Sequence, residues 1–365
     1  MNKKEKNINL DLIRFVAVFS VISVHFFLNN GFYKQEVVGE RMYIMVFMRT
    51  ALMVCVPLFL LLTGYLMNKK TLSKKYYYSI NKTLWIYVIA SIFIALFKQV
   101  FLNKPYTLRE IILGILGFNI AGYSWYVKMY IGLFLLIPFF NVMINNLTKN
   151  QKKILIITLI ILTTLPSLTN IFNFTVEGWW QNPTISNKYN PLIPNWWTNI
   201  YPITYYFIGA YLFEHDIAIN KKLNLVVFFL AILLFGAFNI YRSYPGTFVK
   251  GIWVQWGSFQ NLITSVLLFV YLSHLNLKNL PMMIKRIIKK ISELSLGIYL
   301  TSEIFDLIIY TQLNNSVSTM THRLNYYFLV VPTIFILSSI ASWLASIIYK
   351  GITMVFNFIK EKQLV

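Results

Sequence analysis

Two basic side chains interrupt an apolar stretch near the start of the chain. Arg14 and His25 lie 11 residues apart, which on an α-helix is about three turns, or roughly 16 Å along one face. A guanidinium that stays charged suits the binding of phosphate or carboxylate, and a neutral imidazole suits proton abstraction near pH 7. The spacing therefore predicts a helix face that binds an anion at one level and holds a base at another.

Each residue also has a purely structural interpretation. Arg14 follows Asp11 by one turn, so the two side chains can form an ion pair while the guanidinium reaches the membrane interface. His25 can be a hydrogen-bonded packing residue. The spacing alone leaves these interpretations open.

The composition places these residues in a membrane protein. Of 365 residues, 57% are hydrophobic and only 12% charged, with a mean hydropathy of +0.60, whereas soluble domains carry about 25% charged residues. A soluble enzyme, a DNA-binding protein and a disordered chain are therefore excluded. The net charge of +21 indicates basic loops beside a lipid bilayer rather than a nucleic-acid partner.

Apolar runs of about 20 residues, each able to cross a hydrocarbon core of about 30 Å, recur along the chain. Only helices satisfy the backbone in lipid over such runs, so we expect an all-α, polytopic integral membrane protein with about ten transmembrane helices. The expected spans lie near Ile8–Leu28, Tyr43–Met67, Ser79–Phe101, Trp125–Ile144, Ile154–Phe172, Ile200–Phe213, Leu223–Tyr241, Phe259–Leu275, Ile291–Leu313 and Tyr326–Phe356.

Basic residues in the gaps predict the orientation. Alternate gaps hold most of them, as cytoplasmic loops do, so both termini are expected to be cytoplasmic. No small-residue cleavage site follows the first apolar run, which we interpret as a retained helix. Residues 1–365 are expected to form a single transmembrane domain with no appended soluble domain. The basic set comprises Lys3, Lys4, Lys6, Lys69, Lys70, Lys74, Lys75, Lys149, Lys152, Lys153, Lys221, Lys222, Lys278, Lys285, Arg286, Lys289, Lys290, Lys350, Lys360 and Lys362.

Four segments, in order, resemble the membrane-bound acyltransferase 3 family. The opening signature is Asp-x-x-Arg-x-x-Ala with a histidine 11 residues after the arginine, here residues 11–17 (DLIRFVA) and His25. The others are residues 57–65 (PLFLLLTGY), residues 125–138 (WY…IGLFLLIP) and residues 294–300 (LSLGIYL). The chain departs from the family at Thr63, where serine is commoner, and at Ser302, near which many members have a histidine. Any role of that second histidine is absent here or is taken by another group.

The resemblance implies a membrane acyltransferase that moves an acyl group, expected to be acetyl, onto a hydroxyl of a cell-surface polysaccharide or a lipid-linked glycan. The implied donor substrate is cytoplasmic acetyl-CoA or a similar acyl-CoA, and no permanently bound cofactor is expected. Arg14 would bind the donor phosphates, and the basic loops Lys69–Lys75 and Lys285–Lys290 would attract the donor. His25 would be the general base or a transient acyl carrier; we favour the base.

Further residues are candidates for contact with substrate. Tyr65, Trp125 and Arg49 are expected to contact it. Glu303 and Asp306, one turn apart, either orient a base or bind a substrate hydroxyl, or else pair with basic residues. Tryptophans between residues 173 and 199 and between Arg242 and Ser258 suit either an interfacial belt or a platform on which sugar rings stack.

Metal binding is not expected, because no two histidines or acids show ligand spacing, and Cys55 is expected to be a small buried residue. The main alternative function is an exporter or flippase of a polysaccharide or lipid-linked sugar, and a second is a structural subunit of a synthesis complex. A separate extracellular transferase is a possible partner. The abundance of Asn, Ile and Lys is typical of an AT-rich genome, so we expect a multi-pass protein of a bacterial cell membrane.

Overall fold

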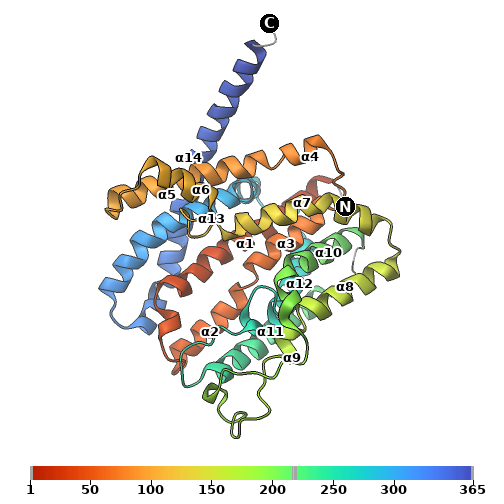
Figure 1. Cartoon of the computed structure of the whole chain (residues 1–365), viewed down its shortest axis with the longest axis vertical. Helices are drawn as coiled ribbons and strands as arrows, with labels where there is room; N and C mark the ends of the chain where they lie inside the picture. Colours follow the sequence, from red (N-terminus) through yellow and green to blue (C-terminus); the bar gives the residue numbers. More distant parts are fainter. Residues whose placement is uncertain (1–2, 216, 218–219, 363–365) are drawn as a thin grey trace.

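A computed structural model describes residues 3–215, 217 and 220–362. Within these residues the chain is helical, with one isolated antiparallel bridge between Glu36 and Thr247 and no strand, so the predicted all-α class is confirmed. The helices are α1 Lys3–Asn29, α2 Glu40–Leu52, α3 Cys55–Met67, α4 Lys74–Tyr78, α5 Asn81–Phe101, α6 Leu108–Leu116, α7 Trp125–Asn145, α8 Lys149–Thr163, α9 Pro166–Thr169, α10 Tyr201–Glu214, α11 Lys221–Ser243, α12 Phe259–Ser273, α13 Met282–Ser316 and α14 Tyr327–Lys362 (Figure 1).

In the described part of the chain, seven segments are long and apolar enough to cross a membrane. They are Ile8–Lys34, Glu40–Met67, Lys74–Phe101, Trp125–Asn145, Lys221–Ser243, Met282–Ser316 and Met320–Gly351. The chain is therefore a multi-pass membrane protein.

The other three expected spans fall on shorter helices. α8, α10 and α12 have 15, 14 and 15 residues, and 15 residues extend only about 22 Å at 1.5 Å per residue. The expected span Ile154–Phe172 is wrong beyond Thr163, where α8 ends. Pro166, which has no amide hydrogen, instead starts the short helix α9.

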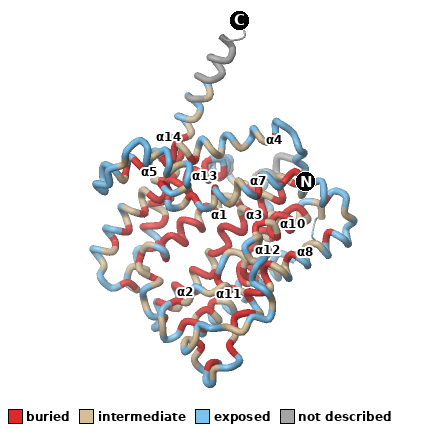
Figure 2. Tube along the Cα trace, in the orientation of Figure 1, coloured by how far each residue is buried: buried red, intermediate tan, exposed pale blue. Residues whose placement is uncertain are grey.

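Buried residues gather along α1, α3 and α10 in the middle of the molecule (Figure 2). α1 packs against α3, α12 and α13, and α13 packs in turn against α14 and α5. α1 thus has protein neighbours on most of its sides, which allows polar side chains on it to be sheltered from lipid.

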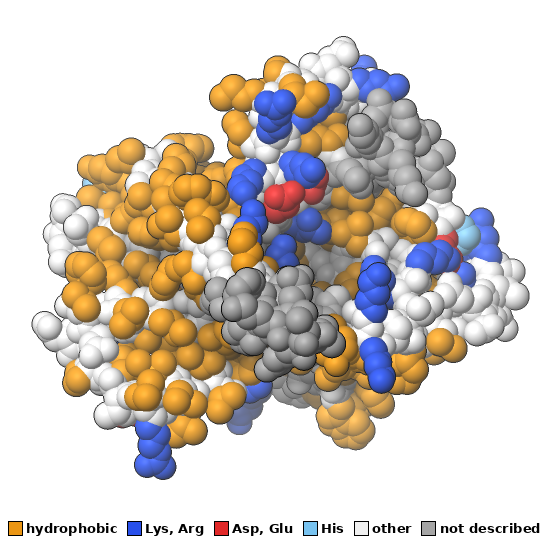
Figure 3. Space-filling view, turned by 90° about the horizontal axis from the view of Figure 1, so that it is seen from above, with side chains coloured by type: hydrophobic (Ala, Val, Ile, Leu, Met, Phe, Trp, Pro, Cys, Tyr) orange, Lys and Arg blue, Asp and Glu red, His pale blue; other side chains and the backbone are white. Residues whose placement is uncertain are grey.

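The peripheral helices expose apolar side chains where lipid would surround them. Several form stripes four residues apart, which is the spacing of one helix face. These are Leu135 and Phe139 on α7, Ile157 and Ile161 on α8, Leu230 and Leu234 on α11, and Ile336 and Ile340 on α14. Figure 3, which looks onto the end from which α14 projects, shows Lys and Arg side chains spread across that end.

The second membrane segment is broken in its middle. α2 ends at Leu52 and α3 begins at Cys55, with Met53 and Val54 between them. Pro57 explains the break, because it cannot donate the helical hydrogen bond to the carbonyl of Met53. Non-helical backbone at membrane depth is tolerated where it lines a cavity, and Met53, Cys55 and Val56 do line one.

α3 and α10 touch through their backbones at two glycines. A Cβ added at Gly64 would lie 2.0 Å from the carbonyl oxygen of Tyr206, and one added at Gly209 would lie 2.0 Å from that of Leu61. Small residues at a crossing let membrane helices approach closely. This contact explains why the Thr63-Gly64 pair has glycine at its second position.

Gly64→Ala should destabilise the protein. The methyl group would force α3 and α10 apart, and such overpacking costs about 1–3 kcal/mol. We expect a lower midpoint of thermal unfolding in detergent. Gly132→Ala on α7 is the matched control, because its Cβ would meet nothing within 4 Å. Equal midpoints for the two variants would contradict the backbone contact.

Candidate active site

His25 is held by a carboxylate from a distant part of the sequence. Its Nδ1 lies 3.0 Å from Oδ2 of Asp306 on α13, and both residues are buried. A carboxylate at Nδ1 favours the tautomer with its proton on that nitrogen, which leaves Nε2 as a proton acceptor. Because His25 also lines a cavity, the pair has the arrangement of an oriented general base.

Tyr123 completes the support of this pair. Its hydroxyl donates to Oδ2 of Asp306 at 2.7 Å, and its ring lies over the imidazole of His25, with centroids 3.9 Å apart. Asn29 donates to the Tyr123 hydroxyl at 3.2 Å and to the backbone carbonyl of His25 at 3.0 Å. The orientation of the imidazole is thus fixed from two sides.

Glu303, one turn before Asp306 on α13, pairs with a lysine and a backbone amide and not with His25. Its Oε1 accepts from Nζ of Lys98 at 2.6 Å, and its Oε2 accepts from the amide of Gly122 at 2.6 Å. Lys98 also donates to the carbonyl of Ile120 at 2.8 Å. Glu303 therefore anchors the loop that carries Tyr123.

Neither acid lines the cavity: Asp306 lies behind His25, and Glu303 lies behind the loop. Of the alternatives that the sequence left open, this placement favours orientation of the base for Asp306 and pairing with a basic residue for Glu303. Ser302, near the position of the family's second histidine, is buried and donates to the carbonyl of Tyr299 at 2.8 Å.

Arg14 is tied to α13 as well. Its Nη1 donates to the hydroxyl of Ser292 at 2.8 Å, and that hydroxyl donates to Asp11 at 2.6 Å. The direct approach of Arg14 to Asp11 is looser, at 3.8 Å. Arg14 keeps 28% of its side chain exposed and lines the same cavity as His25.

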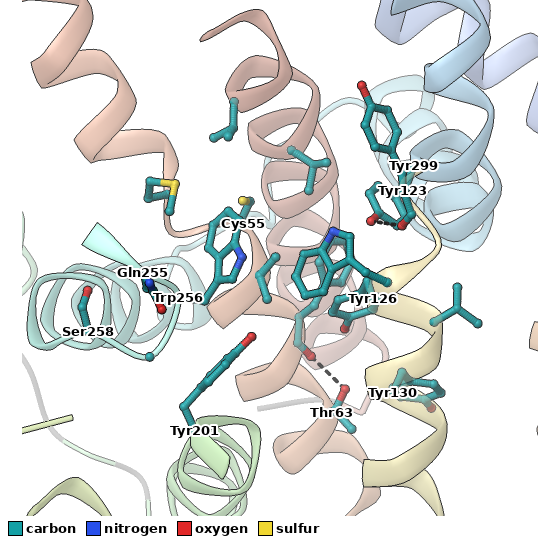
Figure 4. Close-up of a pocket in the computed structure, with 18 of the residues that line it drawn as sticks. Cys55, Thr63, Tyr123, Tyr126, Tyr130, Tyr201, Gln255, Trp256, Ser258 and Tyr299 are labelled. Carbon is teal, nitrogen blue, oxygen red and sulfur yellow. Dashed lines mark hydrogen bonds between the residues drawn. The ribbon is translucent and has the colours of Figure 1, made fainter. Parts of the chain in front are cut away.

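The shared cavity has a volume of ≈ 780 Å³. Arg14 and His25 enter it from α1, so it extends along roughly 16 Å of that helix. Aromatic rings form much of its wall: Figure 4 shows Tyr126 and Tyr130 from α7 on one side, with Tyr201 and Trp256 across from them. Trp125 stacks on Trp256, with ring centroids 6.2 Å apart at an interplanar angle of 15°.

The other expected contact residues divide into two groups. Trp125 and Arg49 line the cavity, whereas Tyr65 does not. Tyr65 is buried, and its ring packs against Phe213 and Phe269, because its position on α3 turns it toward α10 and α12. The structure thus places Tyr65 in the packing of α3 against α10 and α12, and its contact with substrate stays a prediction.

The outer tryptophans are divided in the same way. Trp256 lines the cavity, but Trp179 and Trp253 are buried on either side of the Arg242 guanidinium, at 5.0 and 4.0 Å from their ring centroids. Trp196 and Trp197 are exposed and lie outside the cavity wall. Only Trp256, among these, is placed where a substrate in the cavity would meet it.

Tyr123 and Lys98 were missed by sequence reasoning. Tyr123 lies two residues before Trp125, in a loop with no periodicity to mark it, and Lys98 resembles any interfacial lysine at a helix end. The available signal was that Glu303 and Asp306, two acids within the apolar part of α13, each required a partner.

Among the described residues, no group of three or more His, Cys, Asp or Glu side chains could hold a metal ion. The cavity wall carries the imidazole of His25, the guanidinium groups of Arg14 and Arg49, and several hydroxyl groups.

A multi-pass helical protein with a carboxylate-held histidine and an arginine in one cavity belongs to the class of membrane-embedded enzymes. The acyltransferase domain profile matches residues 7–347. The chain is a member of this acyltransferase 3 family, which confirms the resemblance seen in the sequence, and it is an acyltransferase. No curated protein and no solved structure matches the chain.

Asp306→Asn should lower kcat for acyl transfer by about 10²-fold, the lower range for a positioned base, with little change in the KM for either substrate. The amide keeps the side-chain volume but removes the charge that fixes the imidazole tautomer. The measurement is initial-rate kinetics on the purified protein. Glu293→Gln, an exposed position on the same helix, is the control; equal kcat values for the two variants would contradict the role of Asp306.

Proposed function

We propose that the protein transfers an acyl group, acetyl in the first instance, from cytoplasmic acyl-CoA to a hydroxyl of a cell-surface polysaccharide or a lipid-linked glycan. The observation that carries the proposal is that Arg14 and the His25–Asp306 pair line one cavity at different depths along α1. Such a cavity brings together a donor and an acceptor that approach from opposite sides of a membrane.

The donor would enter at the Arg14 end. CoA carries several phosphates and does not cross a bilayer, so its binding site has to open on the cytoplasmic side. The positive-inside rule assigns the N-terminal end of α1 to that side. A guanidinium with free Nη donors, held by Ser292 but partly exposed, suits a phosphate.

His25 would act on the acceptor hydroxyl. Nε2 takes the hydroxyl proton while the oxygen attacks the thioester carbonyl and forms a tetrahedral intermediate. That intermediate breaks its carbon–sulfur bond, and the imidazolium returns the proton to the departing thiolate, so the base is regenerated. Asp306 stabilises the imidazolium between the two steps. A transient acyl-imidazole is the alternative route through the same residue.

The stacked pair Trp125 and Trp256 would hold the sugar. Their rings present flat apolar faces to the cavity, and such faces suit the C–H side of a sugar ring. An exporter would also use aromatic contacts, and buried histidine–carboxylate pairs serve as proton relays in some transporters. The match to the acyltransferase domain over residues 7–347, together with the oriented base, supports a transferase over an exporter or flippase.

His25→Ala should abolish acylation while the glycan still reaches the surface. The measurement is mass analysis of surface polymers from a deletion strain complemented with wild type or variant. Loss of the mass of one acyl group per modified sugar would also identify that group. His322→Ala, in an exposed turn, is the control. Loss of the surface glycan itself would point to export instead.

Arg14→Ala should raise the KM for acyl-CoA by about 10- to 100-fold, because a hydrogen bond to a charged group contributes about 1.5–3 kcal/mol. The KM for the acceptor should change little. Kinetics in detergent would measure both constants, with Arg109→Ala, an exposed residue on α6, as the control. A rise confined to the acceptor KM would reverse the assigned direction of donor entry.

A further inference from the structure

Beyond His25, the cavity contains two cations that both contact one tyrosine ring. Tyr33 follows the end of α1, in a short turn over Phe32–Lys34. Nζ of Lys250 lies 3.9 Å from its ring centroid, and the guanidinium carbon of Arg49 lies 5.6 Å from it. Arg49 Nε donates to the Tyr33 hydroxyl at 2.8 Å. All three side chains line the cavity.

These cations lack the acidic partners that two other lysines of the bundle have. In the described part of the chain, Lys98 and Lys152 pair with glutamates at 2.6 and 2.5 Å, whereas neither Arg49 nor Lys250 has a carboxylate within 4.0 Å. Arg49 lies on the membrane segment Glu40–Met67 and is only 5% exposed, whereas Lys250 is exposed in the loop after α11. A buried guanidinium without a counter-charge is costly at membrane depth, which makes Arg49 a candidate functional residue.

The guanidinium of Arg49 is positioned but not saturated. Phe248 covers one face, with its ring centroid 4.6 Å from the guanidinium carbon, and Tyr33 accepts from Nε. Among the described residues, Nη1 and Nη2 have no hydrogen-bond acceptor. These donors form the fork that binds carboxylate or phosphate, to which an ammonium adds a point charge.

Both cations face the same region of the cavity. Nζ of Lys250 and the guanidinium carbon of Arg49 lie 3.9 and 5.6 Å from the ring centroid of Tyr33, so they lie within about 10 Å of each other, a range over which like charges repel. An oxyanion bound by the Nη donors of Arg49 would reduce that repulsion. The arrangement therefore favours binding of an anion.

We propose that Arg49, Lys250 and Tyr33 form an oxyanion subsite that binds a phosphate or carboxylate of the acceptor. The acceptor is then an acidic glycan or a diphosphate-linked glycan, and not a neutral sugar chain. This inference rests on the proposed function and names the acceptor class for the same cavity. An anion held there would place a neighbouring sugar in the cavity that His25 also lines.

A second hollow gives the rest of the acceptor a path. It has a volume of ≈ 270 Å³, shares Lys250, Ile252 and Gln255 with the main cavity, and is bordered by Asn170 and Asn195 from the loops beyond α9. The Asn170 amide is bonded to loop backbone and to the Asn195 side chain, so it holds the rim of this hollow in place. The shared wall lets a glycan chain continue outward past Lys250.

Calorimetric titration of the purified full-length protein tests the subsite. The probes are inorganic pyrophosphate, glucuronate and, as the neutral match, glucose. Every variant carries Arg14→Gln, so that the other cation of the cavity does not bind the probe. We expect at least one anion to bind, and to bind at least tenfold more weakly after Arg49→Gln or Lys250→Gln, while Arg49→Lys retains part of the affinity. Lys104→Gln, an exposed lysine outside the cavity wall, should have no effect.

Each outcome has a defined meaning. If the variants weaken only the binding of pyrophosphate, the result supports a diphosphate-linked acceptor. If they weaken only the binding of glucuronate, it supports an acceptor that bears a carboxylate. Lys250 is exposed, so Lys250→Gln should not disturb folding. The subsite would be overturned if neither anion binds, or if Lys250→Gln leaves the affinity for the anions unchanged.

Acylation assays distinguish failure of the anion subsite from failure of the proposed acyltransferase function. If His25→Ala abolishes acylation but Arg49→Gln and Lys250→Gln leave the acceptor KM unchanged, the subsite is wrong and the transferase stands. If His25→Ala leaves acylation intact, the transferase is wrong, whatever the titration shows.

Discussion

The parallel packing of α1 on α13 is the contact on which the site depends. Asp11 meets Ser292 and His25 meets Asp306, each pair 281 residues apart in the sequence. Two pairs with the same separation mean that the helices run in the same direction and in register. A shift of one turn, about 5.4 Å, would break both pairs, so the anchoring of Arg14 and the orientation of His25 are set together.

The cost of charge in lipid explains how the remaining polar groups are arranged. Glu303 with Lys98, and Asp306 with His25 and Tyr123, satisfy one another behind the cavity wall. Charges without an acidic neighbour, at Arg49 and Lys250, face the cavity instead. The result is a cavity whose wall combines cations from several elements with aromatic rings.

Irregular backbone makes room for that passage. The break between α2 and α3 at Met53 and Val54 brings a non-helical stretch to the cavity wall, and the glycine contact at Gly64 and Gly209 holds α3 against α10. The break opens space on one face of this segment while the glycines close the other. Tyr65, on the closed side, packs against Phe213 and Phe269 and is not part of the cavity wall.

The sequence by itself determined the membrane class, the long apolar helices and the shared face of Arg14 and His25, because hydropathy and helix periodicity act over a few turns. It also carried the acyltransferase family, since those motifs are local. It did not determine the end of α8 at Thr163 or the break between α2 and α3. Only the tertiary structure decided that Asp306 holds His25, that Glu303 anchors the loop of Tyr123, that Tyr65 lies outside the cavity wall and that Arg49 and Lys250 both contact Tyr33. These partners are distant in sequence, and helix packing, which depends on side-chain shape across the whole bundle, brings them together.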